Sequence, residues 1–169
     1  MKQENLRKMI IGALFCALVF AATCISIPTV IGNLNLGDGM LLLGAWMLGG
    51  PWAVIAGCIG ASLADLIGPY AMYAPATAII KALMSVVAIA AVKGLRRTRL
   101  SVSAVRLISA TSAEVVMVVG YFLYEAFFLG YGAVAALSAV AFNLLQGGLA
   151  VAVSMLSCQL LDKAGIKFL

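Results

Sequence analysis

The sequence predicts an all-α integral membrane protein, a single membrane domain over residues 1–169 built as a bundle of six transmembrane helices. Of its 169 residues, 64% are hydrophobic and only 10% are charged, whereas an average soluble domain is about 45–50% apolar and about 25% charged. Uncharged stretches occur at 9–27, 39–64 and 126–161, and a helix that crosses a bilayer needs about 20 apolar residues. This composition excludes a soluble globule and a disordered chain.

Turn-forming residues divide the apolar stretches into separate helices. The Gly-Gly-Pro sequence at 49–51 is typical of a tight turn between two spans, because glycine ends helices and proline begins them. Similar residues at 68–75 and 130–132 separate the later spans. The predicted helices, of which the second is short, cover residues 9–28, 38–49, 51–67, 75–93, 104–129 and 132–161.

The basic residues predict the orientation of these helices. Positive charges near the ends of spans stay on the cytoplasmic side. An even number of spans places both termini and the 93–106 segment on that side together, and this agrees with the charges. The net charge of +5 therefore indicates membrane topology and not a nucleic-acid partner. The ten basic residues on the predicted cytoplasmic side are Lys2, Arg7, Lys8, Lys93, Arg96, Arg97, Arg99, Arg106, Lys163 and Lys167.

Several chemistries lack the residues they need. The sequence contains no histidine, so histidine-based metal sites and Ser-His dyads are absent. It also contains no G-x-x-x-x-G-K-[ST] phosphate loop, so an ATPase that drives transport would be another chain. Asp38 and Asp65 are too few for phosphatidyl transfer, which needs clustered aspartates. We therefore predict neither an enzyme nor a bound cofactor or metal.

Five ionisable residues lie within the apolar segments, where a charge at the centre of a span is disfavoured by about 2.5–3.5 kcal/mol. Such residues usually face the interior of the bundle or a water-filled cavity. Lys81 shares one helix face with Thr77 and Ser85. Two alternatives remain open for Lys81: an ion pair with Asp65 or direct contact with a ligand. The five residues are Asp38, Asp65, Lys81, Glu114 and Glu125.

The last two predicted helices carry further candidates. Glu114, Tyr121 and Glu125 share one face of the fifth helix. Glu114 is about two turns from the basic segment, and either binds a ligand or forms a structural pair. For Glu125, near the outer end, solvation is a sufficient explanation. Asn143 and Gln146 are one turn apart, and their amides either bind a ligand or bridge helices.

Two segments on the predicted outer side, 28–39 and 68–75, carry Gly, Asn, Pro and Tyr without Lys or Arg. They are expected to be loops that form a lid over a small ligand, with tyrosines stacking on it and amides bonding to it. The alternative is ordinary interfacial loops with aromatic belts. The residues that would close over the ligand are Asn33, Asn35, Asp38, Tyr70 and Tyr73.

Small residues recur at every fourth position on two helices, which permits close contact between helices. Packing inside the bundle and contact with a partner chain are the alternatives for each stripe. The first helix carries Ala13, Ala17 and Ala21; the third carries Ala53, Gly57 and Ala61, with Ala56, Gly60 and Ala64 beside them.

Five motifs in order resemble the substrate-binding S components of energy-coupling factor (ECF) vitamin transporters, over nearly the whole chain. Together the motifs resemble the riboflavin-type group, which includes pyridoxine and thiamine-precursor transporters. The motifs are Asn35-Leu-Gly-Asp38, the turn at 49–51 with Ala61-Ser-Leu-Ala-Asp65, Tyr73-Ala-Pro75 through Lys81, Glu114 through Tyr121, and Asn143-Leu-Leu-Gln146-Gly147.

This resemblance implies a subunit of a prokaryotic plasma membrane that captures a vitamin outside the cell. It implies delivery to a shared module of one transmembrane coupling protein and two ATPases. In the family an Ala-x-x-x-Ala motif on the first helix meets the coupling protein, and Ala13, Ala17 and Ala21 match it.

The charges of the predicted interior limit the chemical class of the substrate. One lysine among several carboxylates disfavours a polyanion such as a folate. A small heteroaromatic alcohol or amine, pyridoxine-like or an aminopyrimidine, is favoured over riboflavin. The alternative is a self-sufficient secondary transporter or channel, which would usually carry an inverted repeat that we do not find. The predicted substrate-binding residues are Asn35, Asp38, Tyr73, Lys81, Glu114, Tyr121, Asn143 and Gln146.

Overall fold

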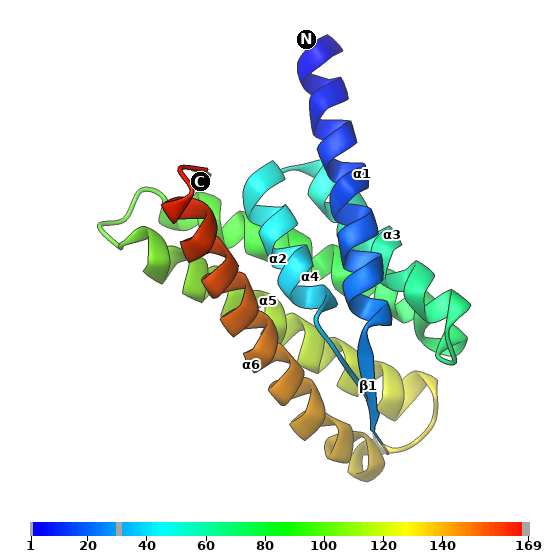
Figure 1. Ribbon diagram of the computed structural model, residues 1–169. Coiled ribbons are helices and arrows are strands. Elements are labelled where there is room, and N and C mark those ends of the chain that lie inside the picture. The colour runs from blue at the N-terminus through cyan, green and yellow to red at the C-terminus, as the bar shows by residue number, and fades with distance from the viewer. Residues whose placement is uncertain (1, 30–31, 167–169) are drawn as a thin grey trace.

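A computed structural model describes residues 2–29 and 32–166. The described chain forms six α-helices around a shared interior, which confirms the predicted all-α class (Figure 1). A short 3₁₀ turn, η1 (Ala71–Tyr73), precedes the fourth helix, and a π-helical turn, η2 (Tyr124–Phe128), continues the fifth. The helices are α1 (Lys2–Cys24), α2 (Gly37–Leu48), α3 (Pro51–Ile67), α4 (Ala74–Leu95), α5 (Val102–Leu123) and α6 (Ala133–Lys163).

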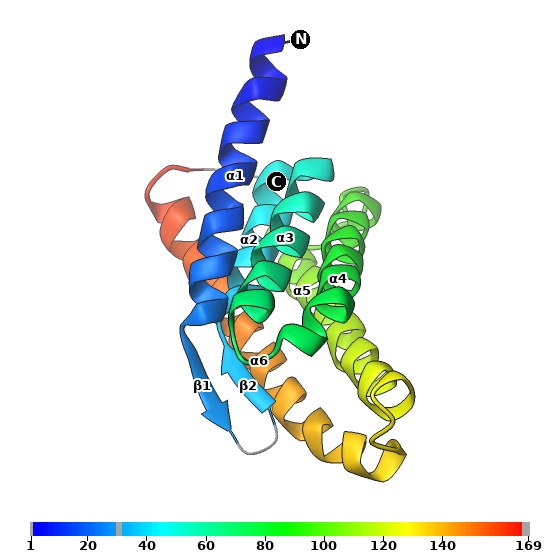
Figure 2. The same cartoon turned by 90° about the vertical axis from the view of Figure 1, so that its right-hand side faces the viewer.

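The segment between α1 and α2 is a β-hairpin, and the predictions of a helix to residue 28 and of a loop over 28–39 were wrong. Strand β1 (Ser26–Thr29) pairs antiparallel with β2 (Gly32–Asn35). Pro28 cannot continue a helix because it lacks the backbone N–H, so the chain satisfies its polar groups across the two strands instead. The hairpin returns the chain to the bundle, where α2 begins (Figure 2).

The turn between α2 and α3 has the predicted form. Gly49 caps α2 in the left-handed conformation with φ of 60°, a region that glycine enters without steric cost. Pro51 then occupies the first turn of α3, where its missing N–H is not needed.

The small-residue stripe of α3 packs inside the bundle. Gly57, Gly60 and Ala61 are buried, and a Cβ added at Gly60 would lie 2.6 Å from the carbonyl oxygen of Cys16 on α1. Only glycine permits so close an approach of these helices. The stripe of α1 differs, because its alanines at 13, 17 and 21 are exposed.

The two ends of the bundle differ in charge. Figure 2 shows both termini and the α4–α5 connection at one end, with the hairpin and the α5–α6 connection at the other. The basic residues thus gather at one end, as predicted, although Lys167 lies outside the described residues. That this end faces the cytoplasm remains a prediction.

Four helical segments of the described chain are long and apolar enough to cross a membrane. Helices α2 and α3 are also apolar, but they have only 12 and 17 residues. A count of six crossings therefore remains a prediction. The four long segments are Gln3–Cys24, Ala71–Leu95, Val102–Phe128 and Ala133–Lys163.

Candidate functional site

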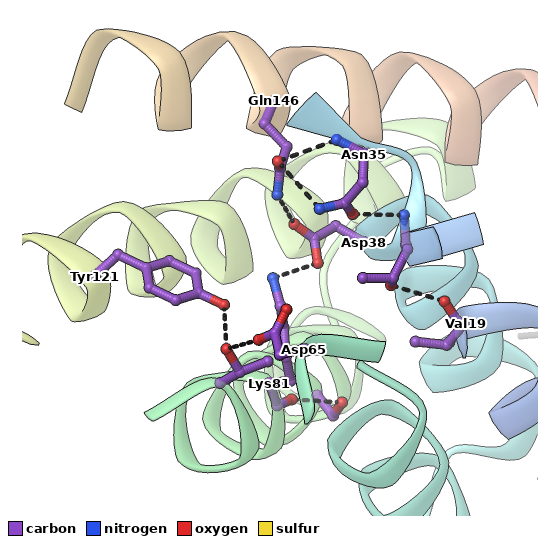
Figure 3. A network of polar contacts seen from close by, with 11 residues as sticks. Val19, Asn35, Asp38, Asp65, Lys81, Tyr121 and Gln146 are labelled. Carbon is purple, nitrogen blue, oxygen red and sulfur yellow. Dashed lines mark hydrogen bonds and ion pairs between the residues drawn. The ribbon is translucent and has the colours of Figure 1, made fainter. Parts of the chain in front are cut away.

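A buried ion pair lies at the centre of the site. Asp38 enters the bundle in the first turn of α2, and its Oδ1 accepts a hydrogen bond of 2.5 Å from the Lys81 ammonium on α4 (Figure 3). The two residues are only 1% and 4% exposed. The predicted alternative of a pair with Asp65 was wrong, because the hairpin brings Asp38 to Lys81 instead.

Gln146 joins this pair to the hairpin and to α6. Its Nε2 donates to Asp38 Oδ2 at 2.9 Å, and its Oε1 accepts from the backbone and side-chain nitrogens of Asn35 at 3.3 and 3.4 Å. Asn35 Oδ1 in turn accepts from the backbone N–H of Gly37 at 3.0 Å. Four of the predicted residues therefore form one connected network: Asn35, Asp38, Lys81 and Gln146.

A second chain of hydrogen bonds runs beside the first. The Thr77 hydroxyl donates to Asp65 on α3, so it has no hydrogen left for the Tyr121 hydroxyl, which lies 2.9 Å away. Tyr121 must therefore be the donor to Thr77. Its ring centroid lies 5.4 Å from the Lys81 ammonium, within the range of a cation–π interaction. The sequence placed Thr77 on the Lys81 face but did not identify its link to Tyr121.

An aromatic cluster lies between the N-terminal end of α4 and the C-terminal end of α5. The Tyr73 ring lies 6.3 Å from Tyr121 and 5.7 Å from Tyr124, and its hydroxyl donates to Glu125 at 3.4 Å. The Tyr124 hydroxyl donates to the Met72 carbonyl at 2.6 Å. Tyr124 was not among the predicted residues, although it follows Tyr121 by three residues, the same spacing as Tyr70 and Tyr73.

Glu114 and Asn143 belong to neither of these two sets of hydrogen bonds. Glu114 is 5% exposed, and no described residue bonds to either of its buried carboxylate oxygens. The buried Nδ2 of Asn143 likewise has no partner within the described chain. The structure therefore does not join these two predicted residues to the network. Asn33, another predicted residue, lies in β2, and its side chain is outside the described part.

Other polar contacts tie the helices together near the basic end. Arg106 binds Asp162 through two hydrogen bonds of 2.6 and 3.2 Å, and Trp46 Nε1 donates to Ser109 at 2.9 Å. These contacts connect α5 with α6 and with α2. Across residues 2–29 and 32–166, no group of three or more His, Cys, Asp or Glu side chains is arranged to hold a metal ion.

Long apolar helices around a buried cluster of charged, amide and phenolic groups define a membrane protein with a polar interior. A family model for the ECF-type riboflavin transporter, S component, matches residues 3–163. The chain belongs to this family, which confirms the resemblance found in the sequence.

A solved structure has the same fold. It is described as "Structure and mechanism of the S component of a bacterial ECF transporter", and it aligns with a TM-score of 0.72 over 96% of this chain and 99% of the other, at 17% identity. No curated protein sequence matches the chain. The protein is thus an S component, the substrate-binding subunit of a transporter and not an enzyme, and the alternative of a self-sufficient secondary transporter or channel loses its support.

Proposed function

We propose that this S component captures a small heteroaromatic vitamin or vitamin precursor, pyridoxine-like or an aminopyrimidine. The observation that carries the proposal is the convergence of the Asp38–Lys81 pair, the Gln146 amide and the tyrosine cluster on one part of the interior. Interior charges of this kind are costly in a membrane and usually serve a ligand or a transport path.

The residues offer complementary contacts to such a ligand. Tyr73 and Tyr121 present ring faces for stacking, which aromatic rings favour in offset or edge-to-face arrangements. The amides of Asn35 and Gln146 exchange their mutual bonds for bonds to ligand hydroxyls. Asn143 donates to a ligand acceptor, and Glu114 accepts from a ligand N–H.

Riboflavin is the second candidate, because the matching family is described as a riboflavin transporter component. We rank riboflavin below the pyridine and pyrimidine candidates on the grounds of charge, since carboxylates outnumber the single lysine in this interior. The same excess of carboxylates disfavours a polyanionic vitamin, whose own carboxylates would face those of the protein.

We further propose that the exposed face of α1 binds the transmembrane coupling protein of an ECF module that also contains two ATPases. Ala13, Ala17 and Ala21 are exposed, whereas Phe15 and Val19 on the same helix are buried in the bundle. A stripe of alanines on a membrane-facing surface permits close approach of another helix. The complex would lie in a prokaryotic plasma membrane with both termini of this chain in the cytoplasm.

Calorimetric titration of the detergent-purified protein tests the substrate class. The compounds are pyridoxine, 4-amino-5-hydroxymethyl-2-methylpyrimidine, riboflavin and folate. We expect saturable 1:1 binding of one of the first two, weaker binding of riboflavin and none of folate. Binding of folate in preference to the others would contradict the assignment.

A further inference from the structure

Glu114 lines an open groove between α5 and α6. The groove encloses about 490 Å³, and its remaining lining is mostly aliphatic. Gly147 and Gly148 contribute no side chains to it, and a Cβ at Gly148 would meet no atom within 4 Å. The groove therefore approaches the Glu114 side chain, while both of its carboxylate oxygens stay buried. The lining residues are Thr111, Glu114, Val115, Val118, Val119, Leu144, Gly147, Gly148 and Val151.

The charges around Glu114 do not balance within the described interior. The Asp38 carboxylate and the Lys81 ammonium both lie within electrostatic range of Glu114. Lys81, however, already binds Asp38 at 2.5 Å, so its charge is largely compensated. Asp65 and Glu125 are held by the hydroxyls of Thr77 and Tyr73 and not by a cation. Apart from Arg106, which binds Asp162 near the basic end, the described interior thus contains four acidic side chains and one basic side chain.

We propose that the captured molecule carries a cationic nitrogen and that Glu114 is its counter-ion. A buried carboxylate without a partner is strongly unfavourable, and a charged N–H donor supplies the bond that the described residues do not. Such charge-assisted bonds are short and about twice as strong as neutral ones. This inference rests on the proposed function and specifies the charge of its substrate.

A matched pair of ligands tests the inference on the whole protein. Pyridoxamine differs from pyridoxine by an aminomethyl group, protonated at neutral pH, in place of a hydroxymethyl group. We expect pyridoxamine to bind wild-type protein at least about tenfold more tightly than pyridoxine, the ratio that corresponds to about 1.4 kcal/mol. Glu114→Gln keeps the size of the side chain and removes its charge, and we expect it to abolish the preference.

The control is Glu4→Gln, which removes an exposed carboxylate from the N-terminal end of α1 and should retain the full preference. Tight binding of pyridoxine or riboflavin, equal to or above that of pyridoxamine, would overturn this inference and leave the proposed function intact. If Glu114→Gln still prefers pyridoxamine over pyridoxine, the inference is also overturned. Such a result is expected if Glu114 is protonated and uncharged, and therefore not a counter-ion. Binding of the aminopyrimidine by a protein that binds neither pyridoxamine nor pyridoxine would overturn the inference alone. If none of these compounds binds, the proposed function fails, and the inference fails with it. If Glu114→Gln does not fold, the inference is tested by whether the wild-type protein binds pyridoxamine more tightly than pyridoxine.

Discussion

Lys81 illustrates what can be predicted about single residues from this sequence. A lysine within an apolar segment must find a partner, and on this ground the sequence indicated either Asp65 or a ligand as the partner of Lys81. The choice of partner depended on the path of the chain between helices. Asp65 was one of two alternatives because it ends the preceding helix, whereas the hairpin places Asp38 against Lys81 at 2.5 Å. No local pattern in the sequence encodes that placement.

Removal of Lys81 alone should destabilise the protein. Lys81→Met leaves Asp38 buried without its cation, and breaking a buried pair in this way costs about 3–5 kcal/mol. Adding Asp38→Asn removes the uncompensated charge, so the double variant should recover part of the lost stability. Thermal unfolding in detergent measures both effects. A double variant less stable than Lys81→Met would show that the pair is not the source of the loss.

Gly147 and Gly148 provide a matched pair of substitutions beside Glu114. A Cβ at Gly147 would lie 3.2 Å from both Cβ and Oε2 of Glu114, whereas a Cβ at Gly148 meets nothing within 4 Å. Gly147→Ala should weaken vitamin binding by roughly tenfold, since overpacking costs about 1–3 kcal/mol. Gly148→Ala should bind as the wild type does. Equal affinities of the two variants in a titration would remove Glu114 from the binding site.

At the scale of elements, apolar runs divided by glycine and proline were sufficient to predict all six helices of the described chain. The hairpin was not predictable in the same way, because each strand has only four residues and lacks a clear alternation of apolar and polar side chains. The π-helical turn η2 also has no signature in the sequence. It nevertheless carries Glu125, which bonds to Tyr73, and π-helical turns frequently occur at functional sites.

The contact between α1 and α3 depends on the absence of a side chain at Gly60. Gly60→Ala would place its Cβ 2.6 Å from the Cys16 carbonyl oxygen, and the helices must separate, at a cost of about 1–3 kcal/mol. Gly94→Ala is the control, since a Cβ there meets no atom within 4 Å. This substitution in α4 should stabilise the helix by up to about 1 kcal/mol. Two similar melting temperatures would contradict the close packing of α1 on α3.

For the whole molecule, composition predicted the membrane class, and the order of the motifs predicted the family that matches residues 3–163. The charge distribution predicted that both termini and the α4–α5 connection lie at one end, as Figure 2 shows. The hydrogen bonds that connect the binding network could not be predicted from the sequence. They join residues more than 40 positions apart, such as Asp38 to Lys81 and Asn35 to Gln146, through the packing of helices that no sequence pattern specifies.

The exposed face of α1 should be needed for transport but not for capture. Ala17→Leu adds bulk to the alanine stripe and should weaken association with the ECF module by at least about tenfold, because overpacking an interface costs about 1–3 kcal/mol. Vitamin affinity of the isolated subunit should not change. Ala152→Leu, at an exposed position of α6, is the control. Co-purification with the module and cellular uptake give the comparison, and full uptake by Ala17→Leu would exclude this face from the interface.

Capture of a small heteroaromatic vitamin is the central claim, and native mass spectrometry of the protein as purified in detergent tests it most directly. We expect one small molecule to travel with each chain, with the mass of a pyridine- or pyrimidine-type vitamin or precursor. Titration of the stripped protein with that compound should restore the complex. A protein that carries no small molecule and binds none of the water-soluble vitamins would contradict the claim.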